Sequence, residues 1–189
     1  MAEKKEKDKT SFSGRWQHKY LENFEKDDNG EWQYKGGYYT FANPNADEKR
    51  LKKNMLICSV IALLGGLGGG LIPAPGSLDI WYVVLPLALT FLMAALLLYK
   101  SACLYTAKSP LRDYDYKSTL GTAGLWNTGL MIAAGCTVIG EIIFLCLHGV
   151  EGVQTAILFL ICETMAFVGS VLWRKAYKKA DYKLIDSKK

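Results

Sequence analysis

Gly124–Trp173 reads GLWNTGLMIAAGCTVIGEIIFLCLHGVEGVQTAILFLICETMAFVGSVLW, and this stretch decides the fold. It holds two long apolar runs, 125–147 and 153–173, on either side of the short segment HGVEG. A hydrocarbon core of roughly 30 Å requires about 20 apolar residues in a helix, so each run is long enough to cross a bilayer. The short connection between the runs predicts an antiparallel pair of membrane-spanning helices.

Two further apolar runs, 54–72 and 80–99, precede this pair, and none of the four runs contains Lys or Arg. The sequence therefore predicts an all-α integral membrane protein, a four-helix transmembrane bundle built from two antiparallel hairpins. The second and the fourth run each end in an aromatic residue that a basic residue follows directly, which weakly indicates an old duplication of a two-helix unit. We expect the transmembrane domain to occupy residues 47–179 and a tail to follow at 180–189.

Positive charge is segregated along the chain. All 23 Lys and Arg residues precede residue 54, lie between residues 100 and 117, or follow residue 173. Short connections rich in Lys and Arg stay on the cytoplasmic side, so we expect both termini and the middle connection there. The membrane would be the cell membrane, with its anionic inner leaflet as a partner of these residues. This topology accounts for the net charge of +5, and no nucleic-acid partner is expected.

The chain before the first apolar run divides into two parts. Residues 1–11 are a lysine-rich polar lead that we expect to be disordered. Residues 12–46 are dense in aromatic side chains and are expected to form a small cytoplasmic module. Trp16, Tyr20 and Phe24 recur every four residues, which favours one face of a short helix.

A β-hairpin is predicted in the same module, because Asn29-Gly30 is a favoured pair for a tight type I′ turn. Its second strand is expected to run to Gly36-Gly37, and residues 38–41 are a possible third strand. Such a small unit cannot bury a core, so its aromatic rings either pack against one another at the membrane interface, which we favour, or form a docking face for a cytoplasmic partner. The residues considered for this role are Trp16, Trp32, Tyr34, Tyr38, Tyr39 and Phe41.

The first apolar run ends in the glycine-rich sequence GGLGGG at 65–70. It contains two overlapping GxxxG spacings, which in lipid allow two helix backbones to approach closely. A phosphate-binding loop would end in Lys-Ser or Lys-Thr, and this sequence does not. We therefore expect helix packing through Gly65, Gly66, Gly69 and Gly70.

Each run of the opening stretch carries one carboxylate, Glu141 or Glu163. A charge at bilayer depth costs roughly 2.5 kcal/mol or more, so such a group usually faces protein or water and often marks a working site. Counted from the connection between the runs, the two glutamates differ in depth by only about 6 Å at 1.5 Å per residue. They are close enough in depth to share one polar pocket, and Thr137, Asn127 and Ser170 are candidates for the same site.

Two functional interpretations follow. In the favoured one, each carboxylate is protonated or hydrogen-bonded inside a helix contact, and the chain is a non-enzymatic assembly or interaction subunit. Such a subunit would form a homo-oligomer or bind a membrane or cytoplasmic partner protein. In the alternative, Glu141 and Glu163 form a proton- or cation-coupled site in a small transporter.

No enzyme, cofactor or metal site is expected. The sequence contains neither GxSxG nor HExxH. Five cysteines lie within or beside the apolar runs without a CxxC spacing, which favours a packing role. The two histidines, His18 and His148, fall at opposite faces of the predicted membrane.

Overall fold

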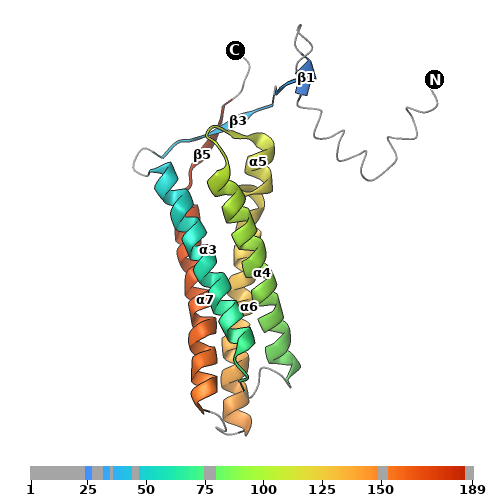
Figure 1. The fold of residues 1–189 in the computed structure, drawn as a ribbon, viewed down its shortest axis with the longest axis vertical. Helices are drawn as coiled ribbons and strands as arrows, with labels where there is room; N and C mark the ends of the chain where they lie inside the picture. Colours follow the sequence, from blue (N-terminus) through green and yellow to red (C-terminus); the bar gives the residue numbers. More distant parts are fainter. Residues whose placement is uncertain are drawn as a thin grey trace, which may run out of the picture.

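The computed structural model of the chain describes residues 24–26, 32–34, 36–43, 47–74, 80–148 and 153–185. Four long helices run side by side in an elongated bundle (Figure 1). All four are long and apolar enough to cross a membrane, which confirms that prediction. These helices are α3 (Glu48–Leu71), α4 (Trp81–Thr106), α6 (Leu120–His148) and α7 (Val153–Lys179).

All four helices extend beyond the apolar runs that predict them, always at the same end of the bundle, and α6 does so by beginning at Leu120. α3 begins at Glu48 because Asp47 caps it, its side chain accepting a hydrogen bond of 3.0 Å from the backbone N of Lys49. α4 continues to Thr106 and α7 to Lys179. The extensions of α3, α4 and α7 carry polar and charged residues, so hydropathy alone predicts helices that are too short.

The helices contact one another in a closed ring, in the order α3, α4, α6, α7 and back to α3. The most extensive contacts join α3 to α7 and α4 to α6. The sequence predicts two hairpins, α3 with α4 and α6 with α7, yet the tightest packing runs between these hairpins. The first and last helices of the bundle therefore close it.

A three-stranded antiparallel sheet lies across one end of the bundle (Figure 1). β3 (Tyr38–Phe41) is central, between β4 (Leu111–Arg112) and β5 (Tyr182–Ile185). The sheet joins the segment before α3, the connection after α4 and the tail after α7; a short helix, α5 (Asp113–Ser118), follows β4. The sequence does not predict this sheet. Because the sheet is present, the fold is mostly but not purely helical. We call this end of the bundle the sheet end.

The predicted hairpin is present, since β1 (Phe24–Lys26) pairs antiparallel with β2 (Trp32–Tyr34). Phe24 therefore belongs to a strand and not to the predicted helix. Residues 38–41 form a strand, as expected, but this strand, β3, pairs with β4 and β5 and not with the hairpin. Outside the described residues lie the lead at 1–11, Trp16, the Asn29-Gly30 turn and the side chain of Trp32.

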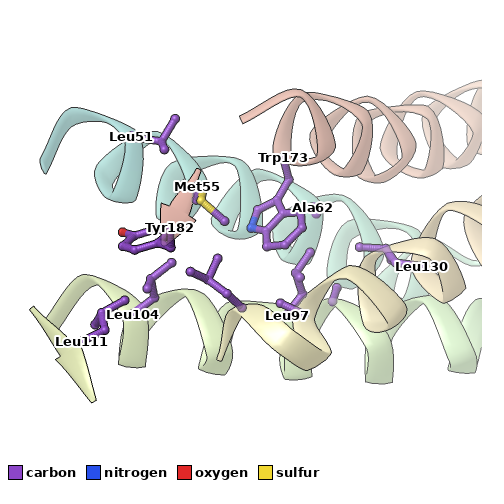
Figure 2. Packing of buried hydrophobic residues seen from close by; sticks show 12 residues of the cluster. Leu51, Met55, Ala62, Leu97, Leu104, Leu111, Leu130, Trp173 and Tyr182 are labelled. Atoms are coloured by element: carbon purple, nitrogen blue, oxygen red, sulfur yellow. The ribbon is translucent and has the colours of Figure 1, made fainter. Parts of the chain in front are cut away.

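Buried apolar side chains from all four long helices and from β4 and β5 form one cluster at the sheet end (Figure 2). In Figure 2 the indole of Trp173 points from α7 toward α3 and α4, beside Met55 and Leu97. Tyr182 brings β5 against the same cluster. Burial of apolar surface therefore fastens the sheet to the bundle.

Candidate functional site

Glu141 of α6 and Glu163 of α7 are fully buried, each with 0% of its surface exposed. The polar residues predicted beside them, Asn127, Thr137 and Ser170, are buried as well. All five side chains are therefore enclosed by protein. No two of them are joined by a hydrogen bond between the side chains that the structure describes.

The two hydroxyl groups of this set are satisfied within their own helices. Thr137 donates to the carbonyl oxygen of Ala133 at 3.0 Å, and Ser170 donates to that of Phe167 at 2.7 Å. Their hydrogens are consequently not directed at a carboxylate. Asn127 makes a weak contact of 3.8 Å from its amide nitrogen to the sulfur of Met131.

Glu163 points from α7 onto the last turn of α3. A Cβ atom placed on Gly69 would collide with Oε1 of Glu163 and lie 3.2 Å from its Cδ. The missing side chain at Gly69 therefore makes room for the carboxylate. Among the described residues, neither carboxylate oxygen of Glu163 has a hydrogen-bond partner. A buried polar group left unsatisfied costs about 1–3 kcal/mol, so this position is energetically unfavourable and is a candidate for a functional role.

Glycines bring the backbones of α3 and α7 into direct contact. A Cβ atom on Gly65 would lie 2.6 Å from the backbone N of Ala166 and 2.6 Å from the carbonyl oxygen of Cys162. A Cβ atom on Gly169 would lie 3.0 Å from the backbone N of Ala62. Stripes of small residues allow membrane helices to approach each other this closely.

The remaining two glycines of the predicted stripe behave differently. A Cβ atom on Gly66 would lie 3.5 Å from Thr90 and 3.7 Å from Phe91, so Gly66 faces α4. A Cβ atom on Gly70 would have no neighbour within 4 Å, so the expected helix contact is missing there among the described residues. A Cβ atom on Gly140 of α6, which the sequence did not single out, would lie 3.1 Å from the carbonyl oxygen of Tyr82 in α4.

A buried hydrogen-bond chain that sequence reasoning missed joins three helices. Trp173 of α7 donates from Nε1 to Oγ of Ser101 in α4 at 3.0 Å, and that oxygen lies 2.7 Å from Oγ of Ser59 in α3. Ser59 donates its single hydrogen to the carbonyl oxygen of Met55 at 2.9 Å. Ser101 therefore donates to Ser59, and every group in the chain is satisfied. The sequence does not reveal this chain, because a single Ser in a helix does not indicate which group it will bond. Trp173 stands at the end of an apolar run, where a Trp is usually taken for a residue of the membrane interface.

Aromatic residues of β3 contact other rings at the sheet end. Tyr39 stacks on Tyr116 with ring centroids 3.9 Å apart, and Phe41 meets Tyr182 edge to face at 5.4 Å. All three of the tyrosines and Phe41 contribute to the apolar packing there. The rings of Tyr39 and Phe41 therefore pack within the chain, against rings that lie outside the N-terminal module.

Tyr34 connects the hairpin to the sheet. Its hydroxyl oxygen accepts a hydrogen bond of 3.2 Å from the backbone N of Asp113, and its ring meets that of Tyr38 edge to face at 5.3 Å. The guanidinium of Arg112 lies 5.5 Å from the ring centroid of Tyr34, within cation–π range. Arg112 and Asp113 come from the connection after α4, so this aromatic contact joins distant parts of the chain.

A charged cluster joins α3 to β5 and to the end of α4 at the sheet end. Lys52 is only 6% exposed; its Nζ lies 2.8 Å from Oε1 of Glu48 and donates to the carbonyl oxygen of Ala107 at 3.1 Å. The hydroxyl of Tyr182 also donates to Oε1 of Glu48, at 3.1 Å. Burial, together with the negative charge of Glu48, raises the pKa of Tyr182 above its ordinary value of 10.0.

The described residues contain no group of three or more His, Cys, Asp or Glu arranged to hold a metal ion. The fold defines a mostly helical protein with four helices able to cross a membrane. Comparison with family models, with curated proteins and with solved structures found no match. Functional inference therefore rests on the geometry of these residues.

Proposed function

We propose that the chain is a multi-pass membrane protein whose sheet end faces the cytoplasm and serves as a non-enzymatic platform for a partner protein. The distribution of charge supports this orientation. Every Lys and Arg residue of α3, α4 and α7 lies in the part of the helix nearest the sheet, and α6 contains none. Membrane helices retain their Lys-rich and Arg-rich connections on the cytoplasmic side.

The free edge of β5 carries the proposal of a partner. Within the described residues, β5 pairs with β3 on one side only. Leu184 and Ile185 on this strand are 54% and 53% exposed. An open edge with large exposed apolar side chains is a template for another strand. The partner would therefore supply an extended segment that lies along β5.

The interior of the bundle supports an assembly role in which the helices act as a rigid support. Gly65, Gly69 and Gly169 are used in the contact between α3 and α7, and are covered by it. Of the residues considered for the docking face, Tyr39 and Phe41 pack in the apolar cluster at the sheet end, and the rings of Tyr34 and Tyr38 contact each other. The helix faces and the aromatic module are therefore less suitable for a partner than the strand edge.

A photo-crosslinking amino acid at Leu184 tests this proposal in native membranes. We expect a discrete crosslinked product, which is lost when the charged substitution Ile185→Asp is added to the strand edge. The same probe at Lys178, exposed at the end of α7, is the matched control. A product of twice the chain mass would identify a second copy as the partner. Equal crosslinking from both probe positions, or none from Leu184, would contradict the proposal.

A second candidate function is supported by the two buried carboxylates. Glu141 and Glu163 both lie in the membrane-spanning part of the bundle with no exposed surface, and intramembrane ionisable residues are functional by default. In this interpretation the chain moves protons or cations, and the two glutamates carry the charge. Proton-driven or cation flux into proteoliposomes, abolished in both Glu141→Gln and Glu163→Gln, would establish it. Flux retained in both variants would exclude it.

A further inference from the structure

A groove of about 970 Å³ lies at the sheet end, between the first turns of α3 and the last turn of α4. Five cationic side chains line it, accompanied by only two carboxylates, those of Asp47 and Glu48. Four of the cations come from the start of α3 and the fifth follows α4. The five are Lys49, Arg50, Lys52, Lys53 and Lys108.

The two carboxylates are already used inside the groove. Glu48 forms the ion pair with Lys52 and accepts the hydrogen bond from Tyr182. Asp47 accepts a hydrogen bond from the backbone N of Lys49 as the helix cap. In the described part of the chain, the other four cations make no ion pair. The groove therefore presents a surplus of positive charge with no internal counter-charge.

Lys52 fixes the two walls of the groove relative to each other. Its buried ammonium group joins Glu48 in α3 to the carbonyl oxygen of Ala107 at the end of α4. Because this bond holds the helix ends together, Lys53 and Lys108 stay on opposite walls of the same hollow. A ligand between them would meet both charges at once.

The surface of α3 changes from basic to apolar along one stripe that starts at this groove. Lys53 is followed at seven-residue spacings by Val60 and Leu67, each 38% exposed. Seven residues are two helical turns, so the three side chains share a face and follow one another at intervals of about 10 Å. A phosphate group beside the cations and acyl chains along the apolar stripe would match this order.

We propose that the groove binds the headgroup of an anionic phospholipid, whose acyl chains lie along α3. The inference rests on the membrane placement proposed above and adds a specific lipid site to it. Each Lys or Arg near a membrane surface adds to the attraction for anionic lipid. Lys53 and Lys108 together would therefore change the affinity for one lipid by at least about tenfold.

Native mass spectrometry of the full chain in detergent micelles tests the site. We expect phosphatidylglycerol to bind at least about tenfold more tightly than phosphatidylcholine with the same acyl chains. The double variant Lys53→Gln/Lys108→Gln should lose this preference, and Lys53→Arg/Lys108→Arg should keep it. The control Lys178→Gln/Lys183→Gln removes two exposed charges from the same end but outside the groove, and should also keep it.

Three results would overturn the proposal. Equal losses in the groove variant and in the control would show general charge attraction without a site. Displacement of the lipid by water-soluble glycerol phosphate at equal concentration would show that the ligand is a free phosphate ester. Equal binding of both lipids by the folded wild-type chain would exclude headgroup recognition. The membrane placement is tested by a different experiment, extraction of vesicles with alkaline carbonate. A chain that does not span the membrane would be extracted, whatever its lipid preference.

Discussion

The carboxylate of Glu163 in α7 occupies the space that a side chain on Gly69 of α3 would fill. Gly69 lies in the last turn of α3, so the buried acid is enclosed in a contact between the first and last helices of the bundle. This relationship explains why a glycine and a glutamate occur together at the tightest helix contact.

Gly65→Ala should destabilise the bundle, because the added methyl group would meet the backbone of α7 at 2.6 Å. Overpacking of this kind costs about 1–3 kcal/mol. Gly70→Ala on the same helix has open space around its Cβ position and should be neutral or slightly stabilising. Thermal unfolding in detergent measures both changes, and equal melting temperatures for the two variants would show that α3 and α7 are not in this contact.

Gly69→Ala and Glu163→Ala should be energetically coupled. Gly69→Ala alone displaces the carboxylate, which is the end of a flexible side chain, so we expect a smaller loss than for Gly65→Ala. Once Glu163→Ala has removed the carboxylate, Gly69→Ala should cost less still. A double-mutant cycle on the free energy of unfolding should give a coupling of about 1 kcal/mol, and strictly additive effects would contradict the contact.

Ser101→Ala should weaken the bundle by about 1–3 kcal/mol, because it leaves the indole N–H of Trp173 buried without an acceptor. Thr122→Ala is the control, since that exposed hydroxyl bonds only to a carbonyl oxygen of the preceding turn. The control should change stability by no more than about 0.5 kcal/mol. Equal effects in chemical unfolding would show that the chain of hydrogen bonds across three helices does not form.

Tyr182→Phe should make the protein less sensitive to alkaline pH. The pKa of Tyr182 in the folded chain is raised above 10.0, so its neutral phenol stabilises the fold fully below that pH. This contribution is lost as the pH rises from 10.0 toward the folded-state pKa. Unfolding measured on both sides of pH 10.0 should show a steeper loss for the wild type, and parallel losses would contradict the burial of this phenol.

The sequence is sufficient to predict the four long helices, because a run of about 20 apolar residues is typical of a membrane-spanning helix. The positions of Glu141 and Glu163 inside the bundle also follow from sequence, since small residues accompany both on their helix faces. Which helix each glycine contacts does not follow from the sequence. Gly65, Gly66 and Gly70 belong to one short sequence, yet they face α7, α4 and open space.

The sheet was missed for a different reason. β4 has only two residues, which is too short to show the alternation of apolar and polar residues that indicates a strand. Its partner β3 lies before α3 and α4 in the chain, so no turn sequence joins the two strands. β5 has four residues at the end of a basic tail, which reads as a solvated segment. The bond between Lys52 and Ala107 is equally invisible in sequence, because it depends on where two helices end in space.

Labelling of single cysteines tests the central claim, that the sheet end faces the cytoplasm, most directly. In a chain whose five natural cysteines are replaced, Lys178→Cys marks the sheet end and Pro73→Cys marks the opposite end. We predict that a membrane-impermeant maleimide labels Pro73→Cys in intact cells, and labels Lys178→Cys only after the cells are permeabilised. Labelling of Lys178→Cys in intact cells, with Pro73→Cys protected, would contradict the proposed orientation.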